Sequence, residues 1–432
     1  MKIHFIGIGG IGVSALSQYF LIKGNKVTGS DLFSSEIINT LKKKGVRIKI
    51  GRHKKENIKK DTDLVIYSPA VPSDNPEVLQ AKAYKIKTLS YPRALGLLTK
   101  QYFTIAVSGT HGKSTVTAMI ALILIKAGFD PTVILGTKLK EFNNSNCRVG
   151  NSKYLVIEAD EWGASFLNYW PKIIVLTNIE REHLDFYKNL SRILKTYRNY
   201  IMHLDENGVL IANKNDENIT KLLKDKKLSR NIFYFSLKNE AKIRIRKVLK
   251  IPGNHNVSNA LAALKLARIL KVPDKISFKA LSQYKGAWRR FEEKNIKIKN
   301  KNYKIISDYG HHPTEIKVTL KAAREKYPQR KIWCIFQPHQ YQRTYYLFND
   351  FVKVFRESGV DKVIITDIFD VFGREEKKIT KRVSSENLAK KINKNKVIYL
   401  PKNKIIDHLK ENLRGKEVII IMGAGDIYEL IV

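Results

Sequence analysis

FTIAVSGTHGKST, residues 103–115, joins an apolar run to two glycines, a lysine and two hydroxyl residues. A strand that leads through glycines into a helix is how many proteins wrap backbone amides around a polyphosphate. The stretch is shorter than the GxxxxGK[ST] pattern, because the first glycine of that pattern is missing. Gly109 and Gly112 still permit close backbone approach, Lys113 could reach the terminal phosphates, and Ser114 is placed to ligate Mg²⁺. A turn without a phosphate would have little need for the lysine.

Length and composition predict a globular protein of several domains. The chain has 432 residues, of which 43% are hydrophobic, and domains of roughly 150 residues suggest about three. No apolar run reaches the ~18 residues of a membrane span, and the first residues do not resemble an export signal. Cys147 and Cys334 are far apart and fit neither a disulfide framework nor a metal site. We therefore expect no membrane insertion and a cytoplasmic location.

The charge is strongly positive. Lys and Arg number 79 against 40 Asp and Glu, which gives a formal net charge of +39. A field of that sign favours anionic partners, from nucleotides to nucleic acid. The lysines are spread along the whole chain, however, without the interleaved aromatic residues of a nucleic-acid groove. We expect mainly a solvated basic surface and no specific nucleic-acid partner.

Short β-like runs alternate with helical patterns in three successive series, which predicts parallel sheets with flanking helices. The fold class expected is α/β with three domains: Rossmann-like at the N-terminus, a central P-loop domain, and Rossmann-like at the C-terminus. We place these domains at residues 1–99, 100–286 and 287–432. The runs interpreted as strands are 3–8, 26–31, 63–68, 153–160, 172–178, 331–336, 362–367, 396–400 and 417–423, with a hairpin over 288–306.

A second glycine motif, GIGGIG over residues 7–12, ends the first predicted strand and begins a helix. Asp31 ends the next strand, 24 residues after Gly7. This is the geometry of a dinucleotide fold, in which amides at a helix N-terminus face a diphosphate. The residues alone leave open NAD, FAD or a UDP-sugar, or a tight turn with a purely structural role.

Polar clusters follow several of the predicted strands. EADE (158–161) and NIEREHLD (178–185) end two strands beside the phosphate loop, where carboxylates and a histidine could hold magnesium; taken alone, each could be solvated loop charge. PGNHN (252–256) could cap the helix that it starts or bind a nucleotide. DYGHHPTE (308–315) carries more polar residues than a plain helix start needs.

Taken in order, nine stretches of the chain resemble the motifs of the Mur ligase family, and together they cover essentially the whole sequence. The resemblance implies three domains, which bind a UDP-sugar, ATP and the incoming amino acid in that order. The nine stretches are HFIGIGGIG (4–12), GTHGKST (109–115), EADE (158–161), TNIEREHLD (177–185), PGNHNVSNALAA (252–263), RRFE (289–292), DYGHHPTEI (308–316), FQPHQYQRT (336–344) and GAGDI (423–427).

The resemblance also implies a reaction, and it is strongest to the branch of the family that acts on UDP-N-acetylmuramate and L-alanine. The lactyl carboxylate would take the γ-phosphoryl group of ATP and form an acyl phosphate. The amine of L-alanine would then attack, and an amide, ADP and phosphate would result, in the synthesis of peptidoglycan precursors. ATP is needed because a carboxylate at neutral pH is a poor electrophile.

Site residues follow from the same resemblance. It implies seven catalytic residues: Lys113, Glu158, His183, Arg290, Asp308, His311 and Arg343. Of these, His311 and Arg343, with Tyr309, would face alanine and the acyl centre. Magnesium would be held by Ser114, Glu158 and His183. ATP would contact Gly109, Thr110, His111, Gly112, Lys113, Ser114, Thr115, His255, Asn256, Asn259, Arg290 and Asp308, and the UDP-sugar would contact Gly9, Gly10, Ile11, Gly12, Asp31 and Ser68.

The chain departs from the family pattern at three places. Trp162 and Gly163 follow EADE where the family usually has Ser-Asp, so the loop near magnesium could differ in shape. Gln340 stands where relatives generally carry a basic residue. Arg198, with Lys195 nearby, occupies the place of a carbamoylated lysine in related ligases, so we do not predict that modification.

Three other functions are consistent with parts of the sequence. A ligase that recycles a whole tripeptide onto UDP-N-acetylmuramate shares the chemistry, but FQPHQYQRT (336–344) favours the alanine branch. An NAD(P)-dependent oxidoreductase built on residues 7–31 would leave GTHGKST and EADE unexplained. A basic ATPase stimulated by nucleic acid would show that stimulation without a UDP-sugar.

Overall fold

The computed structural model describes residues 1–228, 231–298, 301–371 and 375–431. Within them it contains three sheets, of five, seven and six strands, which confirms the predicted α/β class with three sheet-and-helix parts. The chain divides into two compact units. The first unit comprises Met1–Ile179, Leu194–Ile245 and Asn259–Tyr284, and the second comprises Glu180–Ile193, Arg246–Ser258 and Lys285–Val432. The domain boundaries proposed from the sequence stay a prediction.

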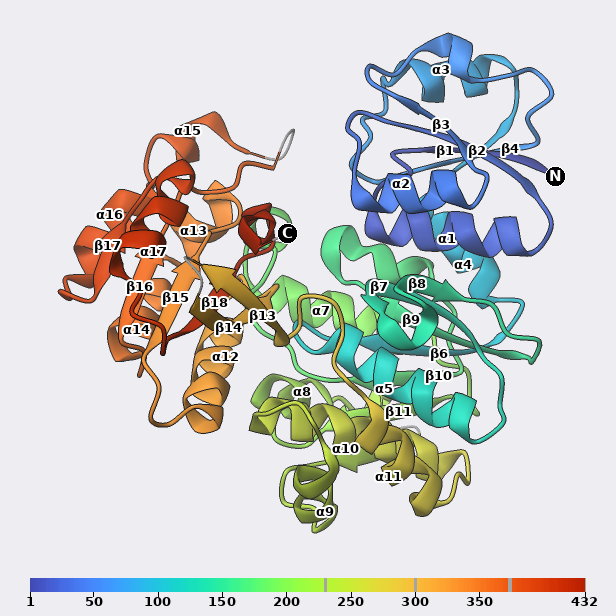
Figure 1. The fold of residues 1–432 in the computed structure, drawn as a ribbon. Helices are drawn as coiled ribbons and strands as arrows, with labels where there is room; N and C mark the ends of the chain where they lie inside the picture. Colours follow the sequence, from blue (N-terminus) through green and yellow to red (C-terminus); the bar gives the residue numbers. More distant parts are fainter. Residues whose placement is uncertain (229–230, 299–300, 372–374, 432) are drawn as a thin grey trace. The chain divides into compact units, whose positions relative to one another are not determined.

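The first sheet is wholly parallel, in the order β3-β2-β1-β4-β5. The central strand β1 lies between β2 and β4, so the strand order reverses there, and ligands of such sheets bind at this point. Figure 1 shows α1 and α2 on one face of the sheet and α3 on the other. The elements are β1 (Lys2–Ile6), α1 (Ile11–Ile22), β2 (Lys26–Asp31), α2 (Glu36–Lys43), β3 (Arg47–Ile50), β4 (Leu64–Tyr67), α3 (Pro76–Ala83), β5 (Lys87–Ser90) and α4 (Tyr91–Thr99).

The second sheet has the order β12-β11-β10-β6-β9-β7-β8, and only its β7–β8 pair is antiparallel. Its central strand β6 lies between β10 and β9, again a point where the order reverses. The strands are β6 (Phe103–Ser108), β7 (Thr132–Leu139), β8 (Ser145–Arg148), β9 (Tyr154–Ala159), β10 (Ile173–Leu176), β11 (Val209–Asn213) and β12 (Ile232–Phe235). The helices that follow them along the chain are α5 (Lys113–Lys126), α6 (Leu184–Tyr187), α7 (Leu190–Ile201), α8 (Glu217–Leu222), α9 (Ala241–Val248), α10 (Asn254–Ile269) and α11 (Asp274–Gln283).

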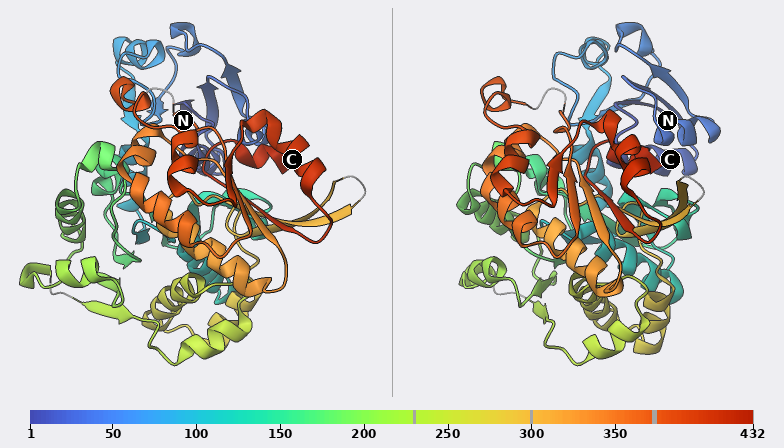
Figure 2. Two further views of the ribbon diagram at one scale, coloured as in Figure 1. Left: turned by 90° about the vertical axis from the view of Figure 1, so that its left-hand side faces the viewer. Right: turned by 60° about the vertical axis from the view of Figure 1, so that its left-hand side comes forward.

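The third sheet has the order β13-β14-β18-β15-β16-β17 and lies in the second unit. The antiparallel hairpin β13–β14 forms one edge (Figure 2), and the other pairs are parallel. The strands are β13 (Glu292–Ile298), β14 (Lys301–Asp308), β15 (Ile332–Phe336), β16 (Lys362–Ile365), β17 (Val397–Tyr399) and β18 (Val418–Met422). The helices are α12 (Pro313–Lys326), α13 (Tyr341–Tyr346), α14 (Phe348–Glu357), α15 (Lys377–Thr380), α16 (Ser385–Ile392) and α17 (Ile405–Asn412).

Apolar strands and helix faces account for these layers. Strands such as β15 and β18 are buried along their whole length, as expected of parallel strands that are covered on both faces. One side of the third sheet packs Phe336, Phe351 and Phe355 into a continuous core. Helix α5 is buried along most of its length and packs against β7, β9 and α11, which fixes the loop that precedes it.

Among the helices that the structure describes, none combines the length and the apolar character that crossing a membrane would need.

Candidate active site

The loop between β6 and α5 requires glycine at two positions. Gly109 has φ +134°, and a Cβ there would lie 2.1 Å from Oγ1 of Thr177. Gly112 has φ +83° and directly precedes α5, and a Cβ there would lie 2.6 Å from Oδ1 of Asn259. Both φ values are in the region that L side chains rarely adopt. The local backbone therefore has the tight form that brings amides toward a ligand at the helix start.

Residues at the end of β10 brace this loop. Asn178 accepts the backbone N–H of Thr110 through its carbonyl (3.0 Å) and that of His111 through Oδ1 (2.8 Å). The hydroxyl of Thr177 donates to the carbonyl of His111 (2.7 Å). The sequence analysis did not name Thr177 or Asn178 as site residues. Their signal was the pair Thr-Asn at the carboxyl end of the strand that adjoins β6.

Lys113 begins α5 and is surrounded by oxygen atoms. Its Nζ donates to the carbonyl of Gly109 (2.7 Å) and to Glu161 (2.8 Å), and it lies 3.6 Å from Asp160. Burial alone would lower the pKa of Lys113, but Glu161 and Asp160 outweigh it and raise the pKa above its usual value. The lysine is therefore a fixed cation at the phosphate loop. Glu161 is only 2% exposed. It was not among the predicted site residues, although it belongs to the EADE cluster.

Ser114, the residue after Lys113 in α5, is hydrogen-bonded to Glu158 of β9. The serine hydroxyl donates to Oε2 of Glu158 (3.0 Å), whose Oε1 accepts the N–H of Gly136 (2.6 Å). A hydroxyl and a carboxylate are the hard oxygen ligands that Mg²⁺ prefers, so these two residues fit the ion. His183, the third predicted ligand, belongs to the second unit, where it has φ +53° and precedes α6.

The residues expected at the UDP-sugar gather around the carboxyl end of β1. Oδ2 of Asp31 accepts the N–H of Gly9 (2.8 Å), and a Cβ at Gly9 would lie 2.9 Å from the same oxygen. Ser68 follows β4, and its Cβ would be 2.9 Å from a Cβ at Gly7. Gly10 precedes α1, and Ile11 and Gly12 are its first two residues, so their backbone lies at the positive end of that helix.

The nucleotide residues predicted around α10 lie in the first two turns of that helix. Asn259 lies beside Gly112 in the first unit. Asn256 and His255 belong to the second unit, and Nδ2 of Asn256 donates to the carbonyl of Pro252 (2.6 Å). In this bond the side chain donates to a carbonyl and does not accept a backbone N–H of the helix, so the choice between helix capping and nucleotide binding stays a prediction.

The second unit brings Asp308 and Arg290 to the end of the hairpin. Asp308 ends β14, and its carboxylate accepts the N–H of Phe291 and that of Gly310, both at 2.8 Å. Burial raises the pKa of Asp308 to about 6, against the opposing effect of Arg290. The guanidinium of Arg290 lies 5.0 Å from the centre of the Tyr309 ring. Arg289, just before it, is 3% exposed.

His311 lies against Tyr309 in the same unit. The two rings meet edge to face at 5.4 Å, and Nδ1 of His311 lies 3.1 Å from the carbonyl of Tyr309. Burial and the nearby Arg343 lower the pKa of His311 to about 4. The imidazole is therefore neutral at pH 7 and can accept or donate a hydrogen bond without carrying charge.

Arg343 forms a buried ion pair with Glu182 inside the second unit. Its Nε and Nη2 atoms both lie 2.9 Å from Oε1 of Glu182, and Nη1 donates to the carbonyl of His339 (2.8 Å). Burial alone would raise the pKa of Glu182, but Arg343 holds it well below its usual range. The nearby Gln340 is only 5% exposed and has φ +72°. A basic side chain at this position would therefore begin inside the protein and not on its surface.

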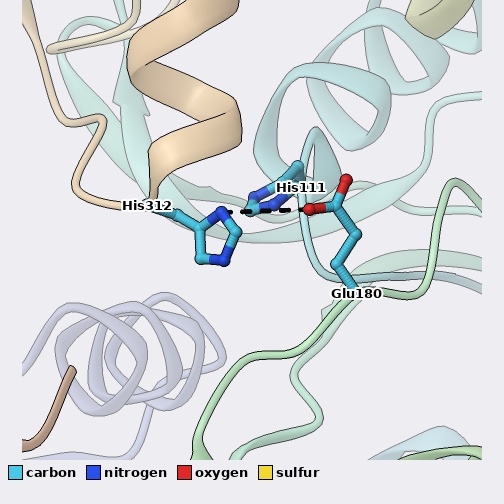
Figure 3. A group of neighbouring side chains, drawn as sticks. All are labelled: His111, Glu180 and His312. Carbon is cyan, nitrogen blue, oxygen red and sulfur yellow. Dashed lines mark ion pairs between the residues drawn. The ribbon is translucent and has the colours of Figure 1, made fainter. Parts of the chain in front are cut away.

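The segment that carries Glu182 makes further contacts with the start of α12. Oε2 of Glu180 accepts a hydrogen bond from the hydroxyl of Thr314 (2.6 Å). The same oxygen lies 3.9 Å from Nδ1 of His312, and Figure 3 draws this pair. Nδ1 of His312 also accepts the N–H of Thr314 and so caps the helix. Nε2 of His312 reaches the carbonyl of Arg181 at 3.2 Å. These bonds hold residues 180 and 181 against the start of α12.

The structure shows the local conformation at the other two departures from the family pattern, after EADE and at Arg198. Gly163 and Ala164, after Trp162, both have left-handed backbone conformations, at φ +59° and +54°. Arg198 pairs with Asp225 through Nε at 2.6 Å, so its side chain is engaged in an ion pair.

Comparisons with known proteins agree with this arrangement. Three family models match consecutive parts of the chain: the Mur ligase catalytic domain (residues 2–103), the Mur ligase middle domain (107–250) and the Mur ligase glutamate ligase domain (289–425). A UDP-N-acetylmuramate–L-alanine ligase of Acetivibrio thermocellus is 43% identical over 99% of this chain and 94% of its own length. The enzyme of that name from Aquifex aeolicus is 39% identical over 99% of this chain and 95% of its own.

Solved structures show the same likeness. The crystal structure of a UDP-N-acetylmuramate–alanine ligase from Thermotoga maritima matches with a TM-score of 0.79 at 29% identity, over 99% of this chain and 97% of that one. A murein peptide ligase from Psychrobacter arcticus shares the fold, with a TM-score of 0.73 at 22% identity over 100% of this chain and 97% of its own. Family models, full-length relatives and shared fold lead to one conclusion: the chain belongs to the Mur ligase family.

Proposed function

We propose that this protein joins L-alanine to the lactyl carboxylate of UDP-N-acetylmuramate and converts ATP to ADP and phosphate in the process, in the cytoplasm, for peptidoglycan synthesis. The observation that carries the proposal is the phosphate loop, in which two glycines of required conformation precede Lys113 and a Ser114–Glu158 pair. The relatives of 39–43% identity over 99% of the chain bear the name of this activity and support the choice of substrates.

In the proposed reaction, a carboxylate oxygen of the sugar attacks the γ-phosphorus and ADP leaves. Lys113 would offset the charge that builds up on the phosphate oxygens, since it stays cationic in its buried setting. The deprotonated amine of alanine then attacks the acyl carbon, and phosphate leaves from the tetrahedral intermediate. His311 would orient polar groups near this step without adding charge, since it is neutral at pH 7.

Magnesium is part of the proposal because Ser114 and Glu158 offer it suitable ligands. When bound, the ion would neutralise phosphate charge and hold the phosphates in register. We expect Glu158→Ala to raise the Mg²⁺ concentration needed for half-maximal activity and to lower the maximal rate. An unchanged magnesium titration in that variant would remove Glu158 from the metal site. The roles of His183, Arg290, Asp308, Asn256 and His255 stay predictions from the resemblance.

The test is phosphate release from ATP by the purified protein with UDP-N-acetylmuramate, in the presence and absence of L-alanine. We expect release that requires both substrates, together with a product heavier than the sugar nucleotide by one alanine residue. Release with L-alanyl-γ-D-glutamyl-meso-diaminopimelate in place of alanine would favour the recycling ligase. Turnover that depends on nicotinamide, or on DNA without the sugar, would favour the other two alternatives.

A further inference from the structure

A carboxylate is completely buried beneath the first sheet. Glu77 is the second residue of α3, and none of its side chain is exposed. Its oxygens nevertheless have four hydrogen-bond partners. Oε2 is bonded by Ser30 Oγ (2.6 Å) and His4 Nε2 (3.0 Å), and Oε1 by Asn57 Nδ2 (2.7 Å) and His53 Nδ1 (3.0 Å).

The four partners keep Glu77 ionised. Burial alone would raise the pKa of this carboxyl, but the hydrogen bonds from His4, His53, Ser30 and Asn57 outweigh it and hold the pKa well below its usual range. Hydrogen bonds to an ionised acceptor are about twice as strong as bonds between neutral groups. The side chains that Glu77 binds are therefore held more firmly than ordinary polar contacts would hold them.

One of the four partners connects the carboxylate to the glycine loop after β1. The carbonyl of Ser30 accepts the backbone N–H of Gly7 (2.9 Å) and of Ile8 (3.1 Å). The next residue, Asp31, accepts the N–H of Gly9 through Oδ2 (2.8 Å). Two adjacent residues at the end of β2 thus fix three successive amides of the loop. Glu77 binds the side chain of the first of these residues.

We propose that Glu77 is a positioning residue for the UDP-sugar: through Ser30 it fixes the turn over residues 7–9, so that the amides entering α1 face the diphosphate. The inference rests on the proposed function for the identity of the ligand. Glu77 itself lies behind β2 and need not touch the substrate. Amides at the start of a helix bind a diphosphate well only when their directions are fixed beforehand.

Two variants interrupt the connection at different points. Glu77→Gln keeps the shape of the side chain but removes its charge and directs N–H groups toward donors. Ser30→Ala leaves Glu77 with its other three partners and keeps the backbone carbonyl that binds the loop. Asn25→Ala is the matched control, because Asn25 bonds the carbonyl of Phe20 (3.0 Å) after the far end of α1. It weakens the same sheet domain away from the loop.

Kinetics of ligation give the first measurement. We expect Glu77→Gln and Ser30→Ala to raise the KM for UDP-N-acetylmuramate about tenfold, the effect of losing roughly one charge-assisted hydrogen bond. The KM values for ATP and L-alanine and the kcat should change less than about twofold, because the phosphate loop of ATP is not connected to Glu77. If Asn25→Ala lowered the melting temperature as much as Glu77→Gln does, and also raised the KM for UDP-N-acetylmuramate as much, the role of Glu77 would be structural only.

Amide hydrogen exchange of the full chain gives a second measurement that does not need activity. Faster exchange at Gly7, Ile8 and Gly9 in both Glu77→Gln and Ser30→Ala, with β6 unchanged, supports the connection to the loop. Unchanged exchange there overturns it, whatever the kinetics. Faster exchange with an unchanged sugar KM overturns the link to binding. A wild-type protein that does not use the sugar nucleotide refutes the proposed function, while exchange still decides whether Glu77 positions the loop.

Discussion

Lys113 is the residue whose replacement should separate chemistry from folding most clearly. Its ammonium group has carbonyl and carboxylate neighbours at 2.7 and 2.8 Å and stays charged. We expect Lys113→Ala to lower kcat by about 10²–10³, the usual cost of one preorganised charge at a transferring group. Melting temperature and circular dichroism check that the fold is kept. Near-normal turnover in a folded variant would remove the lysine from the reaction.

Arg343 raises a sharper question, because the structure engages its guanidinium with Glu182. We propose that it also anchors the carboxylate of L-alanine, since a guanidinium can pair with a carboxylate through two hydrogen bonds. Arg343→Lys cannot make that fork, and we expect a KM for L-alanine raised about tenfold with the KM for ATP unchanged.

The matched variant for Arg343 is Glu182→Gln, which weakens the ion pair but keeps the guanidinium. If Arg343 binds alanine, Glu182→Gln should leave the alanine KM unchanged or lower it, while both variants lose melting temperature. If the ion pair has only a structural role, Arg343→Lys and Glu182→Gln should lose similar stability and have the same KM for L-alanine. Kinetics with alanine as the varied substrate, together with thermal melts, distinguish these outcomes.

The loop and helix after β6 form one functional element, and its geometry can be tested with a pair of glycines on the same helix. Gly112 precedes α5 and Gly128 follows it, with φ +83° and +81°. Alanine at either position costs about 1–2 kcal/mol of backbone strain. Only at Gly112 would the new methyl group also contact Asn259, at 2.6 Å, whereas Gly128 has open space.

We therefore expect Gly112→Ala to lower kcat/KM for ATP at least about tenfold, and Gly128→Ala to lose similar stability with near-normal activity. The comparison separates distortion of the phosphate loop from general loss of stability. Equal kinetics in the two variants would show that the conformation at Gly112 does not matter for ATP.

At the scale of elements, the sequence predicted several of the buried, apolar strands, but it missed β7 (TVILGTKL) and β11 (VLIAN), which are also largely buried. β15 and β18 were predicted within a residue or two, because continuous apolar runs that end at glycine or polar residues have few alternatives. β3 (RIKI) and β5 (KTLS) were missed: both are short edge strands with exposed or half-buried residues. Their pairing comes from the parallel neighbours β2 and β4, which no local pattern reveals.

The site was predicted in a similarly uneven way. Lys113, Ser114 and Glu158 could be named because glycines, lysine and strand-end acids have a recognisable order along the chain. Thr177 and Asn178 begin the stretch TNIEREHLD but were not named as site residues, since they brace the loop across the sheet from a different strand. Glu77 is invisible for the same reason: its partners His4, Ser30 and His53 lie 24 to 73 positions away.

At the scale of the whole molecule, the net charge of +39 is the largest electrostatic feature. Such a charge attracts any polyanion at low salt, but the attraction acts through released counterions and carries no sequence information. At about 0.15 M salt the Debye length is only ~8 Å, so lysines spread over the surface do not act together on one ligand. The structure includes several of them in local ion pairs, such as Lys138 with Glu36 and Lys402 with Asp426.

We therefore expect duplex DNA to bind this protein weakly, with a dissociation constant no tighter than about 10⁻⁶ M at physiological salt, and equally for unrelated sequences. Fluorescence anisotropy of two short duplexes between about 50 and about 300 mM salt, roughly one third to twice physiological strength, measures the affinity and its steep decline with salt. Phosphate release should not respond to DNA, while it should respond to UDP-N-acetylmuramate with L-alanine. Because both assays use the same preparation, tight binding that persists at high salt, or ATP hydrolysis stimulated by DNA alone, would assign the basic surface a function of its own. Weak binding that disappears at high salt, without stimulation by DNA, would mean that the positive charge attracts small anionic substrates only in a general way. Selectivity would then reside in the fixed amides and charges of the glycine loops after β1 and β6.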